Sequence, residues 1–208
     1  MGKHYSSLKM YTIDIKALTN SISDRCEATP LSDRALEQLC RDNPELKFET
    51  DTTGKLIVMS PTGSESGKRN GDLLIQIGIW NRRKKLGVVF DSSTGFKLSN
   101  GATRSPDVSW IQLERWNQLT PQEKRGFAPI DPDFVIELMS PTDELLVTQK
   151  KMAEYISCGV KLGWLINPDG KEVEIYRYGK DKEIVANPNS LSGEELLSEL
   201  TVDLTEIF

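Results

Sequence analysis

A single carboxylate interrupts an otherwise apolar stretch in the second half of this 208-residue chain. Glu137 lies inside the run Phe134 to Met139, whose other members are apolar and whose length predicts a buried central strand. An ionised carboxylate in such a strand costs free energy unless a cation or hydrogen-bond donors offset its desolvation. Glu137 therefore needs a partner, either as half of a buried ion pair or within a polar site.

Helices and short strands alternate around this run. Ser32 is a good N-cap for a short helix that ends before Asn43-Pro44, and a hairpin follows across the turn 51–54. This order predicts an α/β or α+β core in which helices flank a mixed β-sheet, with the N-terminal helix and β-hairpin as an extension. Further helices are expected at 65–85 and 140–158, and further strands at 88–90, 95–98, 107–111, 162–166 and 173–177.

The chain length fits one core with appendages. Residues 1–30 are polar and are interpreted as a loosely ordered N-terminal arm, which leaves residues 31–208 as a single domain. No window approaches the roughly 18 apolar residues of a transmembrane helix, and the N-terminus has no apolar signal core. These features predict a cytoplasmic protein without a membrane partner.

Charge and residue usage narrow the chemistry. The net charge of −5 argues against coating nucleic acid by bulk attraction, so any such contact must be local. The single histidine, His4, makes histidine catalysis improbable, and three separated cysteines support neither disulfides nor a thiolate zinc site. An enzyme with this composition would rely on carboxylates and lysines.

Asp107 is the natural companion of Glu137. It follows Pro106 at the start of a predicted strand. An Asp and a Glu at neighbouring strand ends form the oxygen-rich pair that Mg²⁺ prefers. The alternative is that Asp107 only caps the start of its strand, because spacing alone does not show that the two carboxylates meet.

The helix after Glu137 offers a cation. At about 100° per residue, Lys151 lies at the border of an apolar sector that contains Met152 and Tyr155. Its ammonium could reach the end of the Glu137 strand, where it could orient a water or stabilise a developing oxyanion. The alternative is a border lysine that snorkels to solvent. Lys150 points elsewhere, and its spacing predicts a surface ion pair with Glu154.

A basic run ends the long helix. Its charges suit the helix dipole, which favours a solvated helix end. Contact with phosphates of a nucleic acid is the alternative, and such contact would carry no information on base sequence. The run consists of Arg82, Arg83, Lys84 and Lys85.

Several short sequence motifs, in a fixed order along the chain, resemble those of a known family. The chain resembles the Uma-two family of restriction endonuclease-like proteins from about residue 30 to the C-terminus. That family resembles the PD-(D/E)XK nuclease superfamily, which implies a restriction endonuclease-like fold. The motifs are Ser105-Pro106-Asp107-Val108-Ser109-Trp110, the segment 132–141 around Glu137, Lys151-Met152-Ala153-Glu154-Tyr155, Gly163-Trp164-Leu165-Ile166-Asn167-Pro168 and Pro61-Thr62-Gly63.

The resemblance implies a metal-dependent endonuclease that hydrolyses DNA phosphodiester bonds. Asp107 and Glu137 would bind Mg²⁺, or Mn²⁺ as a substitute, and the carbonyl of Leu138 would be a backbone ligand. The superfamily's lysine stands two residues after the Glu, where this chain has Met139. The family places that lysine on the following helix, which agrees with the independent choice of Lys151.

Two further expectations follow from the resemblance. Glu65, at the start of the long helix, resembles an additional acidic residue of some superfamily members, although the helix dipole alone would favour an acid there. Nuclease folds of this class often pair, so a homodimer is expected. The competing hypothesis is a catalytically silent protein that keeps the fold as a nucleic-acid-binding or assembly module, which the net charge of −5 slightly favours.

Overall fold

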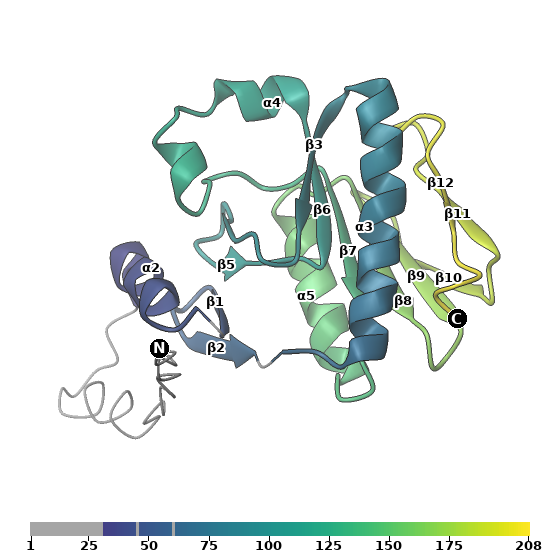
Figure 1. Cartoon of the computed structure of the whole chain (residues 1–208), viewed down its shortest axis with the longest axis horizontal. Coiled ribbons are helices and arrows are strands. Elements are labelled where there is room, and N and C mark those ends of the chain that lie inside the picture. Colours follow the sequence, from purple (N-terminus) through teal and green to yellow (C-terminus); the bar gives the residue numbers. More distant parts are fainter. Residues whose placement is uncertain (1–30, 45, 60) are drawn as a thin grey trace, which may run out of the picture. The chain divides into compact units, whose positions relative to one another are not determined.

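The computed structural model describes residues 31–44, 46–59 and 61–208, so the predicted arm lies outside the described residues (Figure 1). The helices are α2 (Asp33–Asp42), α3 (Ser64–Lys84), α4 (Leu113–Gln118), α5 (Leu145–Ser157) and the 3-10 turn η1 (Glu123–Arg125). The strands are β1 (Lys47–Thr50), β2 (Leu56–Met59), β3 (Gly87–Asp91), β4 (Phe96–Lys97), β5 (Thr103–Arg104), β6 (Val108–Gln112), β7 (Phe134–Leu138), β8 (Leu162–Asn167), β9 (Glu172–Arg177), β10 (Glu183–Ala186), β11 (Ser190–Ser192) and β12 (Thr201–Asp203).

A six-stranded sheet with the order β10-β9-β8-β7-β6-β3 forms the centre of the fold. Strands β7 and β8 run parallel because α5 connects them, whereas every other neighbouring pair is antiparallel. This arrangement confirms the predicted mixed sheet flanked by helices. None of the helices in the described ranges is both long and apolar enough to cross a membrane.

The two long helices cover opposite faces of this sheet (Figure 1). Side chains alternate between the faces along a strand, so Phe134 and Ile136 of β7 pack with α3, and Val135 packs with α5. Glu137 follows the same alternation and therefore faces α5. The α3 side buries Leu73, Ile77 and Trp80, and the α5 side buries Met152 and Tyr155.

The hairpin of β1 and β2 is joined to the rest of the domain by a second sheet, ordered β2-β1-β5-β4. The link is short, since Thr50 of β1 pairs with Thr103 of β5 and the Thr50 hydroxyl accepts the Thr103 amide at 3.1 Å. Strand β5 ends three residues before Asp107. The hairpin therefore reaches the start of β6, a contact that the sequence pattern does not predict.

Three local features differ from the sequence expectation. Helix α5 begins at Leu145 rather than near Ser140, because the Asp143 carboxylate accepts the Ser140 amide and hydroxyl and closes a turn. A six-residue helix, α4, lies between the two predicted strands 107–111 and 134–139, where no helix is expected from the sequence. Strand β10 extends the sheet beyond β9 and was not predicted.

Asp133, at the start of the β7 segment, has no exposed side-chain area and holds three parts of the fold together. It accepts the Gln112 amide at 2.9 Å and pairs with Arg115 and Lys161, each at 2.8 Å. Burial alone would raise the pKa of Asp133, but the Gln112 amide and the two cations hold it below its ordinary value.

We predict that Asp133→Ala lowers the free energy of unfolding by about 3 kcal/mol, because it leaves a buried amide and two cations without their acceptor. The lowered pKa means that this contribution is present above the ordinary value of 3.8 and is lost as the pH falls further. Urea denaturation at pH 7 and pH 3 measures both effects. The exposed Asp169→Ala is the control and should stay within about 0.5 kcal/mol of the parent.

Candidate active site

The strand register brings Asp107 and Glu137 together. Val108 of β6 pairs with Ile136 of β7, so Asp107, one residue before β6, lies opposite Glu137. Their side chains share the α5 face of the sheet, because residues directly opposite in an antiparallel pair point to the same side. The Leu138 amide donates to Asp107 Oδ2 at 2.9 Å and fixes that carboxylate at the end of β7.

Lys151 meets this pair from α5. Its Nζ lies 2.9 Å from Glu137 Oε1 and 3.0 Å from Glu49 Oε1, and its side chain is only 16% exposed. The Tyr155 hydroxyl, one helical turn later, donates to the same Glu137 oxygen at 2.9 Å. The structure thus joins the two sequence-predicted residues Glu137 and Lys151 in one buried contact.

Glu49 is the member of the cluster that sequence reasoning missed. It lies on β1, is 2% exposed, and accepts the Ser105 amide at 2.9 Å. Glu49 follows the apolar Phe48 in a pattern of alternating apolar and polar residues, which predicts that Glu49 faces solvent. No local sequence signal indicates that it is buried. Glu49 is buried by contacts with distant parts of the chain, namely β5 and Lys151 of α5.

An outer ion pair supports Glu49. Arg104 Nη1 lies 3.2 Å from Glu49 Oε2, and the same guanidinium contacts Glu154 Oε2 through Nε at 2.7 Å and Nη2 at 2.6 Å. Asn100 donates to the other Glu154 oxygen at 3.0 Å. The predicted surface pair between Lys150 and Glu154 is therefore wrong, because Arg104 offers a better-placed partner from another part of the chain.

The acidic residues of the cluster differ in how burial affects them. Burial raises the pKa of Glu137 to about 7, and the negative charges of Asp107 and Glu49 add to the rise, against the opposing effect of Lys151. Burial also raises the pKa of Asp107, with Lys47 and the Leu138 amide opposing it. Both carboxyl groups are therefore short of compensating positive charge.

Glu49 and Lys151 form the compensated part of the cluster. Burial would raise the pKa of Glu49, but Lys151, the Ser105 amide and Arg104 hold it below its ordinary value. Burial would lower the pKa of Lys151, but the carboxylates of Glu137 and Glu49 hold it above its ordinary value. Lys151 is consequently a cation over the whole physiological pH range.

The donor set fits a hard divalent cation. In the described ranges, Asp107 Oδ1 and Glu137 Oε2 accept no hydrogen bond, so each carboxylate keeps one oxygen available. No three His, Cys, Asp or Glu side chains of the described residues are grouped so as to hold a metal ion by themselves. Mg²⁺ does not require such a group, since it usually binds one or two carboxylates and completes its shell with waters and substrate phosphates.

The other sequence-predicted residues lie elsewhere. Glu65 is exposed at the start of α3 and pairs with Arg69 at 3.0 Å. Leu138 ends β7 beside Asp107. The basic run lies at the Gln112 end of β6, opposite to Asp107, because Gly87 pairs with Gln112. Arg82, Arg83 and Lys85 are exposed, and Lys84 pairs with Glu199 at 2.5 Å.

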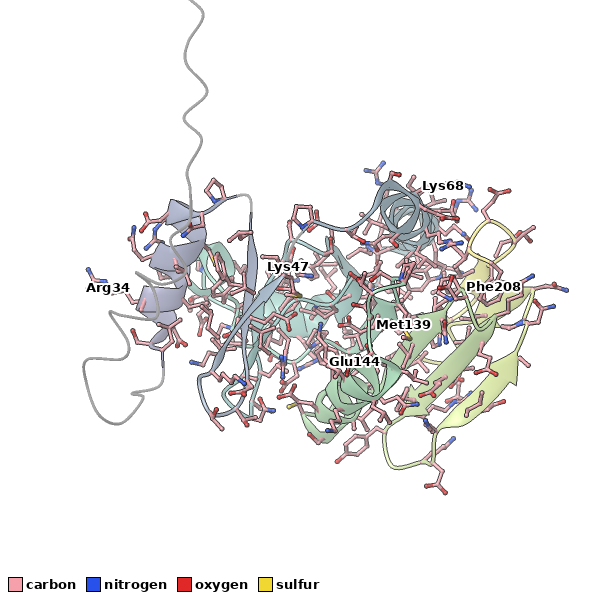
Figure 2. The ribbon with its side chains drawn as sticks, turned by 90° about the horizontal axis from the view of Figure 1, so that it is seen from below. Arg34, Lys47, Lys68, Met139, Glu144 and Phe208 are labelled. Atoms are coloured by element: carbon pink, nitrogen blue, oxygen red, sulfur yellow. The ribbon has the colours of Figure 1, made fainter. Side chains whose placement is uncertain are left out.

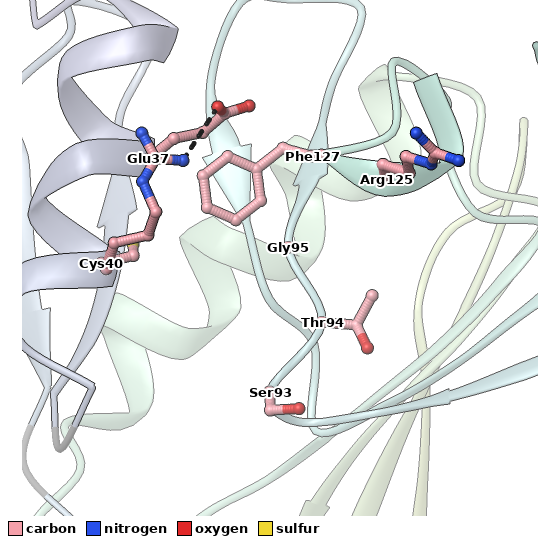
Figure 3. Close-up of a pocket in the computed structure, with 9 residues that line it drawn as sticks. Glu37, Cys40, Ser93, Thr94, Gly95, Arg125 and Phe127 are labelled. Carbon is pink, nitrogen blue, oxygen red and sulfur yellow. Dashed lines mark ion pairs between the residues drawn. The ribbon is translucent and has the colours of Figure 1, made fainter. Parts of the chain in front are cut away.

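The cavity that lies beside α2 does not coincide with the carboxylate cluster. Figure 3 shows a cavity of ≈ 260 Å³ between α2, the turn after β3 and η1, lined by Glu37, Cys40, Arg125 and neighbouring residues. Its acidic residue, Glu37, already pairs with Arg41 at 3.6 Å. The cavity contains none of the buried charged groups described above, so the carboxylate cluster is the stronger candidate for chemistry.

Comparisons with known proteins agree with this architecture. The model of the family Uma2, described as "Putative restriction endonuclease", matches residues 33–205 and confirms the family predicted from the sequence. A crystal structure from Anabaena variabilis ATCC 29413, described as "a putative nuclease belonging to DUF820", shares the fold with a TM-score of 0.64. It is 24% identical, and the match covers 77% of this chain and 89% of that one. No curated protein matches the chain.

We expect the carboxyl group of Glu137 to titrate near pH 7 in metal-free protein, because burial and neighbouring carboxylates disfavour its ionised form. Its folded pKa lies above the ordinary value of 4.5, so its contribution to stability is present below pH 4.5 and is lost as the pH rises through about 7. An NMR titration of the glutamate carboxyl carbons, assigned with Glu137→Gln, measures the midpoint. A midpoint at the ordinary value would contradict this assignment of the site's electrostatics.

Proposed function

Because the chain belongs to the Uma2 family, we propose that it is a nuclease that hydrolyses DNA phosphodiester bonds with the help of a divalent cation. The observation that carries the proposal is the convergence of Asp107, Glu137 and Lys151 at one end of β6 and β7. Two carboxylates with available oxygens beside a fixed ammonium are suited to phosphoryl chemistry.

Asp107 and Glu137 would hold the cation, Mg²⁺ or in its place Mn²⁺, and the Leu138 carbonyl would be a third ligand. Such an ion polarises a phosphate and lowers the pKa of a bound water. The chain's own contribution is to hold the two carboxylates rigidly. The Leu138 amide fixes Asp107, and the Tyr155 hydroxyl fixes Glu137.

Lys151 supplies the positive charge on the protein side. Its contacts with Glu137 and Glu49 hold the ammonium in one place and keep it protonated. From that position it can orient the attacking water or stabilise the negative charge that develops on the phosphate oxygens. Glu49 is a positioning residue in this scheme, because it acts through Lys151.

Contact with DNA would be local, and contacts to its phosphates would carry no information on base sequence. Lys47 lies at the site end of the domain, where its Nζ donates to the Ser105 carbonyl at 2.9 Å and its charge acts on Asp107. The basic run remains a proposed phosphate contact at the other end of the sheet. Phosphate contacts of this kind weaken steeply as salt is added.

The alternative function is a catalytically silent nuclease-fold module that binds nucleic acid or assembles with other molecules. Two observations favour it, the net charge of −5 and the separation of the basic run from the carboxylates. The buried charge of Glu137 favours the nuclease, because a structural strand would be more stable with an apolar residue at that position.

We expect the parent to cleave supercoiled plasmid or single-stranded DNA in Mg²⁺ or Mn²⁺ and not in EDTA. Asp107→Asn, Glu137→Gln and Lys151→Ala should each lower the rate by about 100-fold or more, because the first two remove a ligand of the cation and the third removes the ammonium that acts on the water or the phosphate. Lys150→Ala is the matched control, an exposed lysine one position away, and should retain the parental rate. The assignment would be contradicted if the control lost cleavage, or if the three variants cleaved as fast as the parent.

Binding of Mg²⁺ should release a proton from Glu137 and should weaken as the pH falls through about 7, because only the ionised carboxylate is a ligand. Titration calorimetry in two buffers of different ionisation enthalpy measures the proton release. Glu137→Gln should lose both the binding and the proton release. Absence of metal binding in the parent, together with absence of cleavage, would favour the silent module.

A further inference from the structure

The solvent side of α3 carries an apolar surface that nothing in the described ranges covers. Ile75 is 59% exposed and Ile79 is 46% exposed, on the side of the helix opposite to the buried Leu73 and Trp80. Figure 2 labels Lys68 on α3, two turns before Ile75 on the same side of the helix, and the Lys68 ammonium pairs with Glu206 at 2.8 Å. Two exposed isoleucines one turn apart form a continuous patch rather than isolated surface residues.

Two glycines flank this patch and leave the helix backbone open. A Cβ added at Gly71 or at Gly78 would meet no atom within 4 Å. Glycine in a helix interior costs about 1 kcal/mol relative to alanine, and the packing of the domain gives no reason for that cost. Without side chains at these positions, a second helix could approach α3 closely.

Opposite charges lie on one flank of the same surface. Asp72 and Arg83 are eleven residues apart, which at about 100° per residue places them in nearly the same direction around the helix. Neither forms an ion pair with another residue of the described ranges. In an antiparallel copy of the helix the order of the two charges is reversed, so each Asp72 would face Arg83 of the partner subunit.

We propose that the outer side of α3, formed by Ile75, Ile79, Asp72 and Arg83, is the contact between two copies of this chain. The two α3 helices pack antiparallel, and the two-fold axis crosses them at the level of residues 77 and 78. Each Ile75 then packs on Ile79 of the partner subunit, and the two Asp72–Arg83 pairs form symmetrically, as an isologous contact requires.

The contact leaves the carboxylate cluster free. Helix α3 covers the opposite face of the sheet from α5, so the contact does not involve the face that carries Lys151 and Glu137. The inference therefore stands independently of the assignment of the carboxylate cluster, although the dimer would take Arg83 out of the proposed phosphate contact of the basic run. A single 21-residue helix spans about 30 Å, which is a small contact and predicts a dimer that dissociates on dilution.

Sedimentation equilibrium over micromolar to hundreds of micromolar concentrations tests the dimer. The parent should approach the mass of two chains, and Ile75→Glu should remain a monomer at every concentration. Leu146→Glu is the matched control, because Leu146 is 71% exposed on α5, and this variant should dimerise like the parent. A monomeric parent, or dissociation by Leu146→Glu instead of Ile75→Glu, would overturn the proposal.

Charge reversal tests the antiparallel geometry with variants that keep the apolar patch. Asp72→Arg alone and Arg83→Asp alone each place like charges opposite each other and should raise the dissociation constant about tenfold or more. The double reversal restores the opposite charges and should restore dimerisation. Failure of the double variant to recover would overturn the antiparallel packing. A monomeric parent whose DNA affinity falls on Ile75→Glu would instead identify the surface as a nucleic-acid contact.

Discussion

The contact of Lys151 with two buried carboxylates is the interaction on which the rest of the structure depends. It joins β7, α5 and β1, three elements that are far apart in the sequence, at a single ammonium group. Buried ion pairs seldom add net stability, because desolvation offsets the Coulomb attraction, so their presence is weak evidence for a structural purpose. Here two carboxylates, Glu137 and Glu49, contact one ammonium, so the evidence for a purely structural role is weaker still. Excess acid at this position agrees with the proposed binding of a divalent cation by Asp107 and Glu137.

The hairpin is part of this site rather than an appendage. Glu49 reaches Lys151 only because β1 pairs with β5, and Arg104 on β5 ties Glu49 to Glu154 on α5. Charges alternate from Glu137 through Lys151, Glu49 and Arg104 to Glu154, so each member has an opposite charge on both sides or stands at an end. Such a network fixes the ammonium more precisely than one salt bridge, because no single rotamer change can satisfy all members.

The sequence supports the parts of this site that depend on local periodicity. Strand alternation and helix period place Asp107, Glu137 and Lys151 on the right faces, and the sheet and helices agree with the predicted fold. Burial of Glu49 follows from a pairing across 53 residues, and no local pattern reports it. The same limit explains why Lys150 was assigned to Glu154, since Arg104 competes from a distant strand. Two of the three Pro-Asp dipeptides, 106–107 and 132–133, show the limit most clearly. Asp133 is paired with Arg115 and Lys161, whereas Asp107 keeps an available oxygen.

The charge balance of the site links metal and substrate binding. Lys151 contacts Glu137 and Glu49, Arg104 also contacts Glu49, and Asp107 lies opposite Glu137. At a pH where all three carboxylates are ionised they outnumber these two cations, and the excess negative charge would repel a phosphodiester. A divalent cation at Asp107 and Glu137 would offset that excess in a low-dielectric setting, where each charge counts more than in water. The protein as a whole is acidic, so its net charge gives little long-range attraction for DNA. Without the cation, that repulsion at the site would not be offset. The cation would thus be needed for DNA to approach the site as well as for chemistry, and the basic run, being at the other end of the sheet, would not replace it.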